Sequence, residues 1–157
     1  MTLPMPLVTI FLRYIRASEE GSARLNLRLM AMTIRGMSLT RTLTASRFLY
    51  YTTFLATMDR QEIIATATLY KHEKSDPAGL SSEDMRGQAS RRIINELVPA
   101  VFPSERHLAS TLQATTRTGL VVALPAWDDL LYETTPLMEE IVSLAPFRDA
   151  LEKEEQR

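Results

Sequence analysis

The sequence predicts an α+β fold: a four-stranded antiparallel sheet followed by helices packed on one of its faces. Three observations indicate this fold class. The first half of the chain contains alternating apolar and polar residues and is dense in threonine, tyrosine and phenylalanine, which is typical of strands. In the second half, apolar residues recur every four positions, as on a helix. Between the halves, residues 74–81 carry a proline and a glycine and predict a loop.

Four segments of the first half predict the strands of the sheet, at residues 7–17, 23–36, 45–58 and 62–73. The second segment alternates most clearly, with Leu25, Leu27 and Leu29 separated by polar residues. A helix over residues 38–57 is an open alternative, but threonine at that density favours a pleated surface. We therefore expect one domain over residues 1–157, with strands at about 7–73 and helices at about 82–157.

The second half predicts helices with identifiable starts and stops. The first helix begins near residue 82 and ends at Pro99, which cannot donate the next backbone hydrogen bond. The next helix runs from an N-cap at Ser104 to a stop at Gly119. The run LVVAL (120–124) is expected to be extended, and WDDLLYE (127–133) to be a short helical piece. A last helix restarts at Pro136 and is interrupted by Pro146.

The composition excludes several kinds of chemistry. The chain has no cysteine, so it forms neither disulfides nor zinc–thiolate sites. Its two histidines, His72 and His107, lie far apart and match no metal-binding spacing, and its five glycines form no phosphate-binding loop. The sequence therefore predicts no catalytic residue, no cofactor and no metal. An enzyme with an apolar small-molecule pocket stays open as a third reading, because distant residues can assemble a site.

Hydropathy and the N-terminal residues bear on where the protein acts. No run of about 18 apolar residues exists, so we expect no membrane insertion. The apolar start lacks a preceding basic region and a cleavage pattern, so it is interpreted as mature structure and not as a signal peptide. We expect a cytoplasmic protein, in agreement with the absence of cysteine.

Charge is unevenly distributed along the chain. Residues 1–60 carry eight arginines against three acids, and residues 120–157 carry nine acids, although the formal net charge is only −1. The arginines support an alternative reading, an oligomeric nucleic-acid-binding or virion structural protein that uses Arg24, Arg28, Arg35, Arg41 and Arg47. A near-zero net charge weakens long-range attraction to phosphates, so the favoured reading has no nucleic-acid partner.

Apolar residues and prolines of the second half carry a resemblance to a known family. Phe102 and Pro103 precede an arginine, Arg106, three positions after the proline. Without a gap there follow a proline, an aspartate, a leucine and an aromatic residue, at Pro125, Asp129, Leu131 and Tyr132. Together with the predicted strands, this pattern over about residues 97–132 resembles the SecB export chaperone family.

The resemblance implies an ATP-independent holdase that binds unfolded or extended client polypeptides in apolar grooves, for protein export or for a dedicated client. It also implies a homo-oligomer, a dimer of dimers, with no nucleotide or metal. Family members are strongly acidic and dock a translocation motor through that surface, whereas this chain is nearly neutral, so a motor partner stays open. The groove candidates are apolar residues near the second helix: Leu108, Leu112, Leu120, Val122, Trp127 and Leu131.

Overall fold

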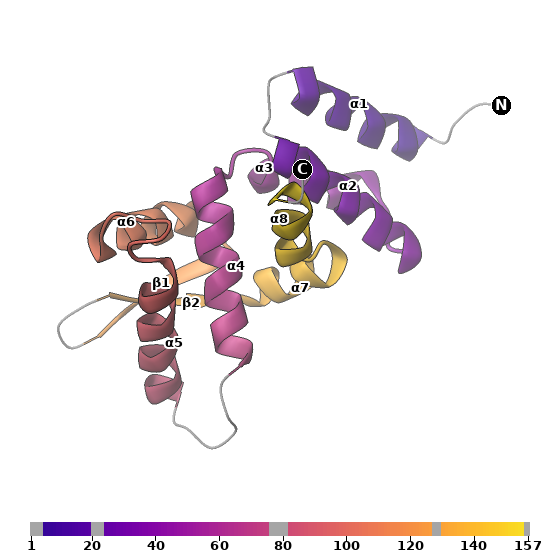
Figure 1. Cartoon of the computed structure of the whole chain (residues 1–157). Coiled ribbons are helices and arrows are strands. Elements are labelled where there is room, and N and C mark those ends of the chain that lie inside the picture. Colours follow the sequence, from indigo (N-terminus) through magenta and orange to yellow (C-terminus); the bar gives the residue numbers. More distant parts are fainter. Residues whose placement is uncertain (1–4, 20–23, 76–81, 127–129, 156–157) are drawn as a thin grey trace. The chain divides into compact units, whose positions relative to one another are not determined.

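The computed structural model describes residues 5–19, 24–75, 82–126 and 130–155, and these residues form helices and one β-hairpin (Figure 1). The chain divides into two compact units. Unit 1 comprises residues 1–59 and 140–157, and unit 2 comprises residues 60–139. None of the helices in the described ranges combines the length and the apolar character that crossing a bilayer requires.

Unit 1 is helical, and its elements come from both ends of the chain. It contains α1 (Met5–Glu19), α2 (Arg24–Leu39), α3 (Ala45–Leu55) and α8 (Phe147–Glu155). Unit 2 contains α4 (Arg60–Lys74), α5 (Ser82–Leu97), α6 (Glu105–Thr115), the 3₁₀ turn η1 (Thr116–Thr118), β1 (Val121–Pro125) and β2 (Leu130–Thr134). Helix α7 (Pro136–Leu144) begins in unit 2 and ends in unit 1.

The predicted four-stranded sheet is wrong, because the four segments that predicted it are α1, α2, α3 and α4. The alternation in the second segment does not correspond to two faces of a strand. Leu25 and Leu29 are buried, but Leu27 between them is only half-buried, and the polar Asn26 is buried as well. Buried positions in α2 continue to Thr33 and Met37, which is helical spacing. The predicted α+β class is therefore also wrong, as is the packing of helices on one face of a sheet. The described residues are mostly helical, with one two-stranded hairpin.

Threonine misled the prediction because several of its hydroxyls are hydrogen-bonded inside these helices, although the buried Thr66 hydroxyl of α4 has no partner. Thr33 Oγ1 donates to Leu29 O at 2.8 Å, and Thr53 Oγ1 donates to Leu49 O at 2.9 Å. Thr52 Oγ1 likewise donates to Leu49 O at 3.0 Å. Bonding to the carbonyl three or four residues earlier lets threonine sit within a helix, even in its interior.

In the second half, the sequence located most elements correctly. Helix α5 ends at Leu97, two residues before Pro99, and α6 starts after Ser104. Helix α7 begins at Pro136, and α8 follows Pro146. The extended run after Gly119 is strand β1. The helical interpretation of 127–133 is wrong for residues 130–133, which lie in β2, and residues 127–129 lie outside the described part of the chain.

One buried amide joins α2 to the end of α3 in unit 1. Asn26 Nδ2 donates to Leu55 O and to Met58 O, both at 2.6 Å. Leu55 is the last residue of α3 and Met58 lies in the connection that follows, where backbone carbonyls lack helical partners. Asn26 is therefore a core residue, surrounded by a core that includes Leu29 and Phe48.

A second polar contact in unit 1 joins α3 to α7. The Tyr51 hydroxyl donates to Glu140 Oε1, and the Arg47 guanidinium pairs with the same carboxylate. The hydrogen bond from Tyr51, followed by that from Arg47, holds the pKa of Glu140 below its usual value. Burial, followed by the bond to Glu140, raises the pKa of Tyr51.

A glycine permits the closest approach of backbones in unit 1. Gly36, near the end of α2, faces the last residue of α7, and a Cβ atom there would lie 2.7 Å from Leu144 Cα and also against Leu144 O. In α5, by contrast, a Cβ atom on Gly87 would meet nothing within 4 Å. The two helical glycines therefore differ in what a methyl group would encounter.

We predict opposite effects for the same substitution at these two glycines. Gly36→Ala should lower the free energy of unfolding by about 1–3 kcal/mol, because the methyl group overpacks a backbone contact. Gly87→Ala should raise it by about 0.5–1 kcal/mol, because alanine is the better helix former in open space. Urea denaturation followed by circular dichroism measures both, and a stabilised Gly36→Ala chain would contradict the close approach of α2 and α7.

Candidate functional site

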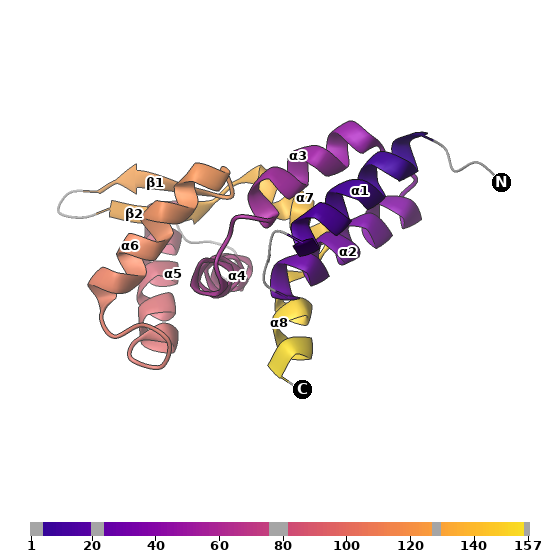
Figure 2. The same ribbon diagram turned by 90° about the horizontal axis from the view of Figure 1, so that it is seen from above.

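Helix α6 lies across α4 and α5 in unit 2, with one face turned into the core (Figures 1 and 2). Leu108, Leu112 and Thr115 form this face and are buried. Their spacing of four and three residues places them on one side of the helix. The direction of the buried face fixes which side chains of α6 point to solvent.

An ion pair fixes the end of α6 against α4. Glu62, in the first turn of α4, is only 3% exposed. Arg117, in the turn after α6, donates from Nη2 to Glu62 Oε2 at 2.8 Å and from Nη1 to Glu62 Oε1. Arg117 Nη1 also donates to Ala114 O at 2.8 Å. Because a buried carboxylate needs a partner, this pair sets where α6 ends on α4.

Opposite the buried face, α6 presents five exposed side chains that we call the outer face: Arg106, His107, Ser110, Gln113 and Ala114. None of the five is a carboxylate. Glu105, in the first turn, is also exposed, and it lines the groove on the α5 side together with Arg106. Arg106 has no hydrogen-bond or ion-pair partner among the described residues. The outer face thus offers hydrogen-bond donors and one unpaired cation.

The β-hairpin lies beside α6. Strands β1 and β2 pair antiparallel, with Ala123 opposite Tyr132 and Val121 opposite Thr134. Tyr132 OH donates to Gln113 Oε1 at 3.3 Å, which connects β2 to the outer face of α6. Thr135 adds a bond from its backbone N–H to Leu120 O at 3.0 Å, just beyond the paired residues. The hairpin therefore extends from α6 in a defined orientation.

A groove of about 410 Å³ lies between α5 and α6 and reaches Tyr132 of β2. Its floor is apolar and includes Ile93, Leu108 and Leu112. Half-exposed Ile94 and Ala109 line it further, with Ser90, Glu105 and Arg106 as the polar lining. We call this the α5–α6 groove.

The six predicted groove residues do not share one surface. Leu108 and Leu112 line the α5–α6 groove, but both are buried. Leu120 is also buried, Val122 is exposed on β1, and Leu131 is half-buried on β2. Trp127 lies outside the described residues. The four-stranded sheet that was expected to form one wall of a polypeptide groove is absent from the described residues, because the segments predicted as its strands are helices.

The N-terminal arginines are also divided by the fold. Arg28 Nη1 donates to Ala150 O at 3.1 Å, and Arg47 pairs with Glu140, so both have structural roles in unit 1. Arg24, Arg35 and Arg41 are exposed. The sequence analysis therefore identified the cationic residues of the first half but missed the outer face of α6. The pattern that could have indicated this face is the polar residues at positions 106, 110 and 113 of a predicted helix.

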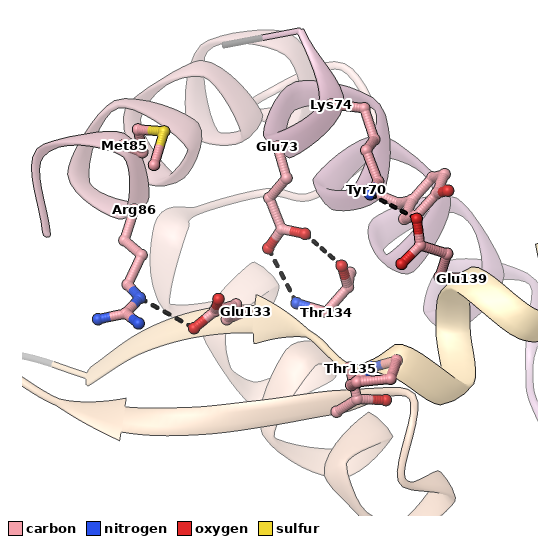
Figure 3. A pocket seen from close by; sticks show the side chains of 10 residues that line it. Tyr70, Glu73, Lys74, Met85, Arg86, Glu133, Thr134, Thr135 and Glu139 are labelled. Carbon is pink, nitrogen blue, oxygen red and sulfur yellow. Dashed lines mark hydrogen bonds and ion pairs between the residues drawn. The ribbon is translucent and has the colours of Figure 1, made fainter. Parts of the chain in front are cut away.

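A polar cavity of about 330 Å³ occupies another side of unit 2 (Figure 3). Three carboxylates from α4, β2 and α7 line it, each with a partner. Lys74 Nζ bonds Glu139 at 2.8 Å, and Arg86 Nε bonds Glu133 at 2.9 Å. The Thr134 backbone N–H donates to Glu73 Oε1 at 2.8 Å, and its hydroxyl donates to Oε2.

The charges of this cavity are therefore paired within the protein. Within the described ranges, no cluster of histidine, aspartate and glutamate could hold a metal ion. Burial is the main influence on Glu73 and raises the pKa of its carboxyl, against the opposing hydrogen bonds from Thr134. Glu73 acts as a clamp that holds β2 on α4. Comparison with family models, with curated proteins and with solved structures finds no match for the chain.

We predict that Glu73 makes stability fall as pH rises. Its pKa is higher in the folded than in the unfolded chain, so the stabilising protonated form is fully present below the ordinary glutamate pKa of about 4.3 and is lost as pH rises through the raised value. Glu73→Gln, which keeps an acceptor for the Thr134 N–H, should therefore be more stable than the parent at pH 7 and similar to it at pH 4.

The control for this prediction is Glu73→Ala, which removes the acceptor altogether. It should cost about 1–3 kcal/mol at both pH values, because the Thr134 N–H loses its partner. Urea denaturation at pH 4, 5.5 and 7 measures all three chains. A difference between the parent and Glu73→Gln that does not change with pH would contradict the raised pKa.

Proposed function

We propose that unit 2 binds duplex DNA, with α6 as the helix that enters the major groove. The observation that supports it is the outer face of α6, where Arg106, His107, Ser110 and Gln113 are exposed and the one exposed carboxylate of the helix, Glu105, lies at its first residue, beside this face. This face contrasts with the rest of the unit. Residues 60–139 contain eleven acids against eight lysines and arginines, so a surface without acids is not what the local composition favours.

The order of elements supports the proposal. Three helices, α4, α5 and α6, are followed by the hairpin β1–β2, an order that resembles a winged helix-turn-helix module. In helix-turn-helix proteins the second helix of the motif lies in the major groove and reads base edges. The connection from α5 to α6, residues 98–104, is longer than the usual three or four residues of the motif. Fold likeness is an analogy, so the proposal rests on the side chains.

The side chains of the outer face suit base and phosphate contacts. Arginine forms bidentate hydrogen bonds with guanine, glutamine forms them with adenine, and serine can bond to either base. Arg106, Ser110 and Gln113 follow one another at spacings of four and three, so they project from one side of α6. The bond from Tyr132 to the oxygen of Gln113 leaves the amide nitrogen of that side chain as a donor.

The net charge of unit 2 limits the expected affinity for DNA. Its formal charge of −3, eight cations minus eleven acids, opposes long-range attraction to phosphates. We therefore expect binding of a single chain to be weak, with a dissociation constant near the non-specific range of about 10⁻⁴ to 10⁻⁶ M on random sequence. A preferred sequence would bind more tightly through the base contacts.

The proposal predicts salt-dependent binding that depends on the outer face. Fluorescence anisotropy with a labelled 24-base-pair duplex of mixed sequence should show binding at 50 mM salt that weakens at 200 mM. Arg106→Ala should weaken it about 5- to 100-fold, the equivalent of about 1–3 kcal/mol for one lost arginine contact. Gln113→Ala should alter sequence preference more than salt dependence.

The matched control is Arg148→Ala, which removes the same charge from an exposed position of α8 in unit 1 and breaks only a surface pair with Glu152. It should leave duplex binding within about twofold, since exposed pairs contribute little. Binding that is absent at 50 mM salt, or that Arg106→Ala and Arg148→Ala weaken equally, would sink the proposal.

A second candidate function, holding an unfolded or extended polypeptide, is supported by the α5–α6 groove. Two residues expected to contact a client, Leu108 and Leu112, line this groove, and half-exposed Ile94 borders it. The parent chain should then suppress aggregation of a denatured client without ATP. Ile94→Asp should abolish that effect, whereas Val122→Asp on β1 should not. Equal suppression by the two variants, or none by the parent, would exclude the groove as a client site.

A further inference from the structure

Helix α1 has two apolar faces, and only one is covered within unit 1. Ile10 is buried against the neighbouring helices. On the other side, Phe11 is 64% exposed, Leu12 is 61% exposed and Ile15 is 37% exposed. With half-buried Val8 they occupy positions 8, 11, 12 and 15, the spacing of an apolar seam between helices. We call these four residues the α1 stripe.

The α1 stripe is the densest exposed apolar surface in the described part of the chain. Five of the six large hydrophobic residues that are exposed there belong to unit 1, and three of the five are in this stripe. Contiguous apolar surface of this kind marks interaction sites in soluble proteins, since burying it gains about 25 cal/mol per Å². The α1 stripe is therefore expected to be covered by a binding partner.

A recess beside the stripe indicates the occupant. It has a volume of about 430 Å³, lies between α1 and α3, and is lined by Leu12, Ile15 and Leu49 with Thr9, Arg13 and Arg16. A cavity of about 150 Å³ is enough to hold a benzene molecule. Phe11 does not line the recess but stands next to it on α1. A projecting aromatic ring and a recess large enough to admit such a ring therefore lie next to each other on α1.

We propose that the α1 stripe is the interface between two copies of this chain, related by a two-fold axis, with Phe11 of each copy in the α1–α3 recess of the other. A two-fold interface joins the same patch to itself, so it needs a projection and a complementary recess side by side. Arg13 and Arg16 at the rim would flank the inserted ring, a placement that favours cation–π contact. This inference concerns unit 1 alone and does not depend on DNA binding.

The size of the surface sets the expected affinity. We expect an interface formed by one helix face and its neighbour to lie at the low end of specific interfaces, below about 1,200 Å² in total. We therefore expect a dimer with a dissociation constant in the micromolar range, on the order of 1–50 μM. Sedimentation at several concentrations across that range observes both states.

The test is analytical ultracentrifugation of the full chain from 1 to 200 μM, with three variants. The parent should convert from monomer to dimer. Phe11→Glu should stay monomeric throughout, and Phe11→Ala should raise the dissociation constant at least tenfold. Leu39→Glu, the same kind of change at a 75% exposed residue at the end of α2, should dimerise like the parent. Circular dichroism checks that all four chains are equally helical.

Three outcomes overturn the proposal. A parent chain that stays monomeric at 200 μM has no such interface, and if that monomer binds vesicles of phosphatidylcholine with phosphatidylserine, the stripe is a membrane-docking surface. A folded Phe11→Glu chain that dimerises as well as the parent places the interface elsewhere. Loss of dimer in both Phe11→Glu and Leu39→Glu would likewise remove the specific role of the α1 stripe.

Discussion

The buried carboxylate of Glu62 is the constraint on which the arrangement of unit 2 depends. A nearly unexposed carboxylate is costly unless it is paired, and its partner Arg117 follows α6 directly. The pair therefore fixes the end of α6 on the start of α4. Leu108 and Leu112 are buried on the side of α6 that faces the core of the unit. With α6 held in this way, its polar side has to face solvent, and β1, which follows within a few residues, has to start beside it.

The sequence indicated the second half of the fold better than the first. Proline, glycine and N-cap residues act locally, so Pro99, Ser104, Gly119 and Pro136 marked element boundaries that the structure confirms. Periodicity failed in the first half because tertiary contacts override it. Asn26 is buried there and donates to carbonyls at the end of α3 and in the connection after it, and several threonine hydroxyls bond within their own helices. Nothing in the local sequence distinguishes such satisfied polar residues from the outer face of a strand.

The candidate site was harder to foresee than the fold. Leu108 and Leu112 were correctly placed on one stripe of a helix, but their role in the core depends on α4, which the sequence had assigned to a sheet. With α4 read as a strand, the outer face of α6 had no defined direction. The α1 stripe was hidden for the same reason, since residues 8, 11, 12 and 15 fall on both faces of a strand but on one side of a helix.

The central claim is that α6, fixed by Glu62 and Arg117, presents its outer face to a DNA duplex. The most direct measurement is the change in backbone amide NMR signals of the ¹⁵N-labelled chain when an unlabelled duplex is added. The account predicts that the largest changes fall on residues 105–114 of α6 and on β1 and β2, with α8 unchanged. Changes confined to the arginine-bearing helices of unit 1, or no changes at low salt, would contradict it.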